Sequence, residues 1–328
     1  MQNQKLLEQK FFERINHKGK LEEISRNVCR DYNLGDFVSH KLIPIGYEDF
    51  NYALETDKGK YFVKVFAKSR TIGECKRITR IIKETSSANV STPKLHQSNQ
   101  GICYSIKNPH TQLQLCVLEY VDGKTIHDLH KPLTKKEIQF IARQAARINT
   151  LHIKPSFIYD EWAIPHFLRE YRKKGKYLNA KDRALIDQLI TAYKKLKLDT
   201  LPHAFVHGDI LTTNIIKDTH RRLWIVDFSV ANYYPRIQEL AVLACNPLFD
   251  EKNKDNSEYQ LQLALKEYQK IIPLTRREQD ALPTYIKLAH AMHLLSANYQ
   301  KVVMHNVSEE NIYFLNQGRN GLKQMGKS

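Results

Sequence analysis

The sequence lacks an uninterrupted hydrophobic stretch of the length that a membrane-spanning helix needs. Its first twenty residues mix charged and apolar side chains without a hydrophobic run, so neither a secretory signal nor a membrane span is expected there. Internal repeats and low-complexity linkers are also absent. With 42% hydrophobic and 26% charged residues among 328, the composition is typical of a globular protein that can form two structural units.

Cysteine is scarce, and its arrangement excludes two kinds of site. The five cysteines are scattered along the chain, and no two of them form a Cys-x-x-Cys pair. An odd number at irregular spacing argues against a disulfide framework and against a zinc site. A reducing, cytoplasmic location is therefore expected.

Acidic residues are outnumbered by basic ones, 35 against 51, which gives a formal net charge of +16. A clustered basic face would indicate a nucleic acid or an anionic lipid as partner. The Lys and Arg residues are instead spread over the whole chain, and no block of five or more like charges occurs. We interpret the excess as a solvated basic surface and do not expect a nucleic-acid partner.

The pattern of apolar residues changes along the chain. Short strands dominate residues 38–120, including a hairpin whose turn is Asp-Lys-Gly-Lys, and helices are expected over 20–32 and 71–86. Beyond Gly123 the pattern is mainly helical, and two Thr-x-x-Glu capping boxes, at 134–137 and 275–278, begin helices there. The sequence predicts an α+β protein with an N-terminal lobe of residues 1–122 and a larger helical lobe of residues 123–328.

Two short apolar strands are expected, and an aspartate lies at the end of each. Asp209 follows AFVH, and Asp227 lies near the end of LWIVDF. Polar residues at strand ends are held rigidly yet remain reachable, so these aspartates and Asn214 are expected to converge. Oxygen ligands of this kind suit Mg²⁺, which predicts Asn214 and Asp227 as metal ligands. Asp209 is then available to accept the proton of an attacking hydroxyl.

The five-residue spacing from Asp209 to Asn214 is that of the catalytic loop of protein kinases. In YFVKVF, Lys64 matches the kinase lysine that pairs the α- and β-phosphates of ATP. Glu74, on the following helix, is the candidate ion-pair partner of Lys64. Further nucleotide contacts are expected at a hinge, where backbone groups of Glu119 and Val121 could pair with adenine. Gly46 is expected in a turn that approaches the phosphates.

The motifs that carry a resemblance to a known family are HGDILTTN, IVDF followed by PRIQELA, YFVKV and LEYVDGKT. Through them the sequence resembles the aminoglycoside phosphotransferase, choline kinase and type II homoserine kinase family over nearly the entire chain. The resemblance implies a bilobal protein-kinase-like fold and an Mg²⁺- and ATP-dependent transfer to the hydroxyl of a small molecule, with ATP between the lobes. It also implies that His207 and Glu239 brace the catalytic loop.

Ser229 stands where protein kinases have the glycine of Asp-Phe-Gly, and Pro235 is expected to open a helix soon after. This leaves little room for an activation loop and favours a small substrate over a protein. The run GYEDFNY, residues 46–52, resembles G-x-E-N-x-N-[YF] of type II homoserine kinases and adds Asn51 to the expected nucleotide contacts.

Homoserine or a similar amino alcohol is the favoured acceptor. An aminoglycoside is the alternative, disfavoured because the helical lobe shows no acidic cluster in the sequence. A non-catalytic nucleotide- or RNA-binding pseudokinase is the alternative of another class, and the intact set of Lys64, Asp209, Asn214 and Asp227 opposes it. No feature indicates the oligomeric state.

Overall fold

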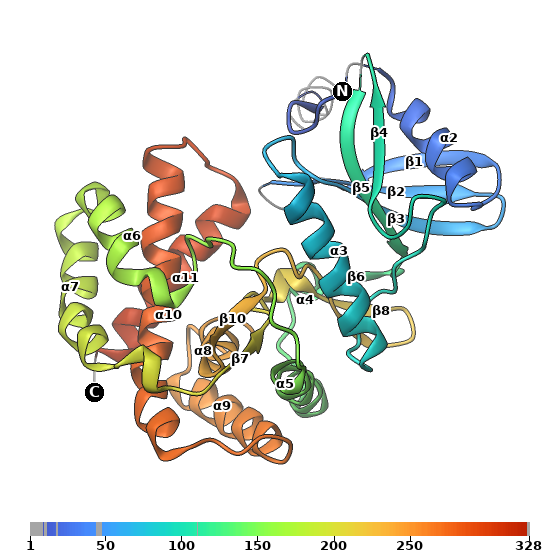
Figure 1. Cartoon of the computed structure of the whole chain (residues 1–328). Helices are drawn as coiled ribbons and strands as arrows, with labels where there is room; N and C mark the ends of the chain where they lie inside the picture. Colours follow the sequence, from blue (N-terminus) through green and yellow to red (C-terminus); the bar gives the residue numbers. More distant parts are fainter. Residues whose placement is uncertain (1–8, 10–11, 18, 44–47, 110, 327–328) are drawn as a thin grey trace. The chain divides into compact units, whose positions relative to one another are not determined.

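The chain divides into two units, each with its own fold (Figure 1). Unit 1 comprises Met1–Gly123 and Asp218–His220, and unit 2 comprises Lys124–Lys217 and Arg221–Ser328. A five-stranded sheet forms unit 1 and helices dominate unit 2, which confirms the predicted α+β class. The computed structural model describes residues 9, 12–17, 19–43, 48–109 and 111–326.

Unit 1 is built on an antiparallel sheet with the strand order β1-β2-β3-β5-β4. The predicted hairpin is present as β2 and β3, in which Thr56 pairs with Gly59 across the turn. The elements of unit 1 are α2 (Leu21–Asp31), β1 (Phe37–Ile43), β2 (Phe50–Thr56), β3 (Gly59–Val65), α3 (Ile72–Ser87), β4 (Tyr104–Asn108) and β5 (Thr111–Glu119).

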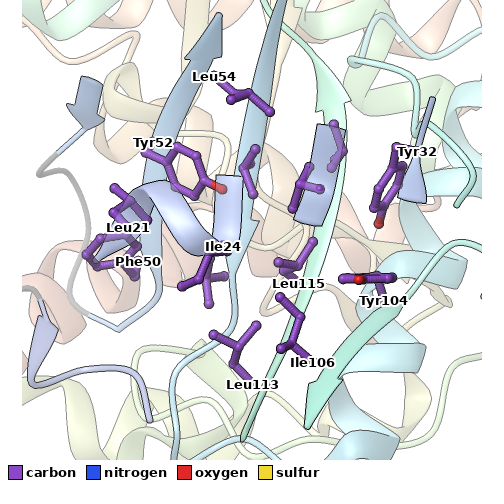
Figure 2. Close-up of a cluster of buried hydrophobic side chains, with 14 of the residues drawn as sticks. Leu21, Ile24, Tyr32, Phe50, Tyr52, Leu54, Tyr104, Ile106, Leu113 and Leu115 are labelled. Carbon is purple, nitrogen blue, oxygen red and sulfur yellow. The ribbon is translucent and has the colours of Figure 1, made fainter. Parts of the chain in front are cut away.

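The core of unit 1 lies between α2 and one face of this sheet (Figure 2). Helix α2 contributes Leu21, Ile24 and Val28, whose three- and four-residue spacing places them on one side of the helix. Successive side chains of a strand point to opposite faces, so Val63 and Val65 pack in this core and Lys64 lies on the other face. This alternation places Lys64 away from α2.

Unit 2 is organised around the long helix α10 (Arg276–Val302), whose residues 288–298 are all buried. Its other helices are α4 (Ile126–Leu129), α5 (Lys135–Thr150), α6 (Phe167–Lys174), α7 (Ala180–Lys195), α8 (Ile237–Cys245), α9 (Lys254–Gln269) and α11 (Glu309–Met325), with short 3₁₀ turns η1 (Ile164–His166), η2 (Gly175–Tyr177), η3 (Leu198–Thr200) and η4 (Thr212–Asn214). Both predicted capping boxes are formed, at the starts of α5 and α10. No helix of the described residues is long and apolar enough to cross a membrane.

Two small sheets position the candidate site of unit 2. Their strands are β7 (His203–Val206) paired with β10 (Asn232–Pro235), and β8 (Ile215–Asp218) between β6 (Gly123–Thr125) and β9 (Leu223–Ile225). The segments that follow β7 and β9 carry the chemistry. The expectation that Pro235 opens a helix is wrong: Pro235 pairs with His203 at the end of β10, and α8 begins at Ile237.

We expect the α2 contact with the sheet to dominate the stability of unit 1. Replacing Ile24, which is 1% exposed, with alanine should lower the free energy of unfolding by about 2–5 kcal/mol because it leaves a cavity beside the sheet. The matched control is Ile72→Ala, since Ile72 is 53% exposed, and its effect should stay near 0.5 kcal/mol. Urea denaturation followed by circular dichroism measures both; equal losses would contradict this assignment of the core.

Candidate active site

The structure brings Asp209 and Asn214 into direct contact in the segment between β7 and β8. The side-chain Nδ2 of Asn214 donates to the carboxylate of Asp209 at 2.7 Å and to its backbone carbonyl at 3.0 Å. The carbonyl of Asn214 in turn accepts a hydrogen bond from the N–H of Val226, the residue before Asp227. The two aspartates and the asparagine that the sequence singles out therefore lie in one region of unit 2.

Asp227 adopts a backbone conformation that is unfavourable for a residue with a side chain. Its φ is +67°, in the left-handed region, where a non-glycine residue costs about 1–2 kcal/mol. Its Oδ1 accepts hydrogen bonds from the hydroxyl of Ser229 at 2.5 Å and from the N–H of Ser229 at 3.2 Å. Strain of this kind concentrates at functional sites, because it holds a side chain where packing alone would not place it.

His207 is fully buried and braces the segment after β7, as expected. Its Nδ1 accepts the N–H of Asp209 at 3.2 Å, so the ring proton is on Nε2, which donates to the carbonyl of Val226 at 3.1 Å. Burial lowers the pKa of His207 to about 4, so the ring is neutral at physiological pH. Both ring nitrogens are occupied by backbone partners, which leaves His207 no part in proton transfer.

Glu239, near the start of α8, is the second brace. Its Oε1 accepts the backbone N–H groups of His207 and Gly208, the latter at 3.2 Å. Gly208 has φ +81°, a conformation that favours glycine. Burial raises the pKa of Glu239 to about 7, and the two backbone hydrogen bonds oppose that shift. The segment that carries Asp209 is thus held from both β9 and α8.

The carboxylate of Asp209 lies in an acidic environment. Burial, followed by the charges of Asp160 and Asp227, raises the pKa of Asp209 to about 8, and Glu310 adds a smaller effect in the same direction. The sequence of the helical lobe shows no acidic cluster because the residues whose charges act on Asp209 are far apart along the chain. Asp160 lies in the coil before η1 and Glu310 in the first turn of α11, far from Asp209 in sequence, so no spacing pattern reveals them.

Asn246, directly after α8, is a further residue that sequence reasoning missed. Its Oδ1 accepts the N–H of Thr212, in the turn between Asp209 and Asn214, at 2.8 Å. Its Nδ2 donates to Gln317 of α11 at 2.9 Å, and Gln317 contacts His293 of α10 at 3.0 Å. The only signal in the sequence is an asparagine within the apolar run LACNPL.

In unit 1, Lys64 forms an ion pair with Asp49 rather than with the predicted partner, Glu74. The Nζ of Lys64 lies 3.0 Å from Oδ2 of Asp49, and these side chains are 7% and 4% exposed. The Glu74 carboxylate accepts hydrogen bonds from the backbone N–H and the hydroxyl of Thr71, at 2.7 Å and 2.8 Å. The predicted Lys64–Glu74 pair is wrong, because Glu74 completes the capping box of α3.

The other nucleotide contacts expected from the sequence are Asn51, Glu119, Val121 and Gly46. Asn51 pairs across the sheet with Lys64, and its Oδ1 has no hydrogen-bond partner among the described residues. The N–H of Glu119 donates to the carbonyl of Lys94 at 2.9 Å, so it is not a donor for an adenine ring. Val121 follows β5 in a coil, and Gly46 lies outside the described residues.

The side chains in unit 2 fit a hard divalent cation. The Nδ2 of Asn214 is occupied by Asp209, which leaves Oδ1 as the acceptor atom of the amide. Together with the Asp227 carboxylate, this provides two oxygen donors from the protein. Mg²⁺ is commonly held by one or two such groups with waters and phosphate oxygens completing its shell. The described residues contain no group of three or more His, Cys, Asp or Glu that could hold a metal by themselves.

The chain is similar to known proteins over most of its length. The sequence model of the phosphotransferase enzyme family matches residues 39–271. The chain is 21% identical over 279 residues to a homoserine kinase of Parvibaculum lavamentivorans, covering 83% of each chain. It is also 21% identical over 287 residues to a homoserine kinase of Zymomonas mobilis, covering 84% of this chain and 85% of that protein.

Solved structures share the fold. A microcompartment-associated aminopropanol kinase superposes with a TM-score of 0.70 at 15% identity, over 93% of this chain and 96% of that one. A spectinomycin phosphotransferase in complex with ADP and spectinomycin superposes with a TM-score of 0.67 at 13% identity, over 93% and 97% of the two chains. The predicted kinase-like fold is confirmed.

The raised pKa of Asp209 predicts a pH-dependent effect of its replacement on stability. An aspartate whose pKa is about 8 in the folded chain and 3.8 unfolded loses stability as the pH rises between these values, because the folded state must give up a proton that it binds tightly. Asp209→Asn removes this loss. In the metal-free protein, the variant should melt higher than wild type by about 2 °C or more at pH 9 and by less at pH 5.

The control for that measurement is Asp199→Asn, which removes an exposed carboxylate from η3. Scanning calorimetry in a chelating buffer compares each variant with wild type at both pH values. The Asp209 pKa is not raised if Asp209→Asn increases the melting temperature equally at pH 5 and pH 9. The same conclusion follows if Asp199→Asn gives the same increase as Asp209→Asn.

Proposed function

The chain belongs to the phosphotransferase enzyme family, and we propose that it transfers the γ-phosphoryl group of ATP to a hydroxyl of a small molecule. The observation that carries this proposal is the contact of Asp209 with Asn214, next to the strained Asp227. One residue to accept a proton and two oxygen donors for a cation are the protein groups that this reaction needs.

We assign the nucleotide to residues 1–122 and the catalytic segment to residues 123–328. Asp209 accepts the proton of the acceptor hydroxyl while that oxygen bonds to the γ-phosphorus, and the bond from phosphorus to the β-phosphate oxygen breaks to release ADP. The Asp209 pKa of about 8 lies near physiological pH, where a general base works best. Mg²⁺ held by Asn214 and Asp227 would offset the negative charge on the phosphates. Lys64 supplies a positive charge for the α- and β-phosphates.

The acceptor is, in this proposal, homoserine or a similar amino alcohol. Asp160 and Glu310 contribute negative charge close enough to Asp209 to affect its pKa. Such an environment favours a substrate that carries an ammonium group near its reacting hydroxyl. The relatives named homoserine kinase and the solved aminopropanol kinase act, by their names, on small molecules of this kind.

An aminoglycoside is the second candidate acceptor, and the same acidic residues favour it. The negative charges that act on Asp209, those of Asp160, Asp227 and Glu310, would also suit a substrate with several ammonium groups. A solved neighbour is a spectinomycin phosphotransferase. The number of cationic groups on the preferred acceptor separates the two candidates.

Radiolabelled transfer tests the proposed reaction. With γ-labelled ATP and Mg²⁺, we expect label to move to homoserine, aminopropanol or another amino alcohol of a substrate panel that also contains choline and aminoglycosides. Asp209→Asn should retain ATP binding and lose about 10²–10⁴-fold in kcat, because the proton has no acceptor. ATP binding without transfer to any acceptor would favour the non-catalytic alternative. Equal turnover by Asp209→Asn would show that Asp209 is not the proton acceptor.

Asp160→Asn tests the proposed role of the acidic environment. Removing this charge lowers the pKa of Asp209, so the acid limb of the kcat/KM profile should move to lower pH. The KM for an amine-bearing acceptor should rise by about tenfold, the size expected for one lost charge-assisted contact. Asp199→Asn, at an exposed site, is the charge-matched control. An unchanged KM together with an unchanged profile would remove Asp160 from the site.

A further inference from the structure

Lys64 lies where a positive charge is costly without a counter-ion. It is the last residue but one of β3, on the face of the sheet away from α2, with Asn51 and Cys116 as its cross-strand neighbours. The residue is 6% exposed. A buried ammonium group requires a paired anion, since desolvation otherwise favours its neutral form. The position of that anion determines where the ammonium group points.

Asp49 supplies the anion and is itself held from several directions. Its Oδ2 contacts Lys64, and its Oδ1 accepts hydrogen bonds from the Arg70 guanidinium at 2.8 Å and from the Ala67 N–H at 3.0 Å. Its backbone carbonyl accepts from the Arg14 guanidinium at 3.1 Å. Because Asp49 directly precedes β2 and Ala67 follows β3, this carboxylate joins the two open ends of the hairpin.

The glutamate that begins α3 performs a different task. Glu74 satisfies the Thr71 N–H and hydroxyl, and these hydrogen bonds lower the pKa of its carboxyl. Its side chain therefore stabilises the N-terminus of α3, where the unpaired N–H groups lie. The ion pair to the strand lysine and the cap of the helix are thus formed by two different acidic residues.

We propose that Asp49, and not Glu74, is the residue that positions Lys64 for the phosphates of the nucleotide; this rests on the proposed function. Asp49 binds Arg70 as well as Lys64, so it keeps a cationic partner when the Lys64 ammonium turns toward a phosphate. Asp49 acts through Lys64 and is a positioning residue. Arg70 serves as the second partner of its carboxylate.

The decisive measurement is the affinity for ATP compared with the affinity for adenosine, which lacks the phosphates. Asp49→Asn should weaken ATP binding by about tenfold or more and leave adenosine within about twofold, the size expected for losing one charge-assisted interaction. Glu74→Gln should weaken ATP binding less than Asp49→Asn does. Glu55→Gln, at a partly exposed site of β2 outside the Lys64 ion pair, is the charge-matched control. Calorimetric titration with Mg²⁺ present gives each dissociation constant.

A double-mutant cycle separates positioning of Lys64 from general damage to the sheet. In a Lys64→Met background, Asp49→Asn should no longer affect ATP affinity, because the group it positions is absent. Three results would overturn the proposal. Asp49→Asn could weaken ATP binding further in the Lys64→Met background, it could bind ATP as tightly as wild type on its own, or Glu74→Gln could weaken ATP binding more than Asp49→Asn does.

Two further results keep the test decisive. If Asp49→Asn does not fold, Asp49→Glu keeps the charge and moves the carboxylate; it should weaken ATP but not adenosine, and equal ATP affinity to wild type would overturn the proposal. If wild type itself does not bind ATP, the proposed function fails. If wild type binds ATP and the Asp49 variants bind it equally tightly, the positioning role is rejected and the proposed function is unaffected.

Discussion

The hydrogen bond from the Asn214 amide to the Asp209 carboxylate connects the proposed base with a proposed cation ligand. It fixes the orientation of the amide, because Nδ2 donates to Asp209 and Oδ1 is the acceptor atom. The loop that carries both residues is irregular backbone, which has no ladder of its own to hold it. His207 connects this loop to the carbonyl of Val226, directly after β9, and Glu239 of α8 accepts two of its N–H groups. Asn246 binds the loop at Thr212 and connects it, through Gln317, to α11 and α10.

The same region carries unfavourable features. Asp209 lies among other carboxylates, Asp227 has a left-handed backbone, and Glu239 is buried with a raised pKa. Each opposes folding, and surrounding packing must offset it. The buried face of α10 and its contacts with α8 and α11 supply such packing in unit 2. The packing of the helices of unit 2 thus offsets the unfavourable free energy of the region around Asp209.

Unit 1 shows how a local rule and a tertiary contact can compete for one residue. The Thr71-x-x-Glu74 pattern is a capping box, and the structure uses Glu74 in that way. The sequence also predicts an ion pair between Lys64 and Glu74, but the Glu74 carboxylate accepts from the N–H and hydroxyl of Thr71. Asp49, adjacent to β2 and brought close by the hairpin, became the partner of Lys64.

Local patterns in the sequence determined much of this protein. The hairpin, the amphipathic face of α2, the capping boxes and the Asp209–Asn214 spacing depend on neighbouring residues, so they can be read from the chain directly. Only the tertiary structure decided the contributions of Asp49, Asp160, Glu310 and Asn246. Each lies in a coil, at a helix end or at a strand edge, and the residue that it affects comes from another element. Such contacts arise from chain packing, and no periodicity or short motif records them.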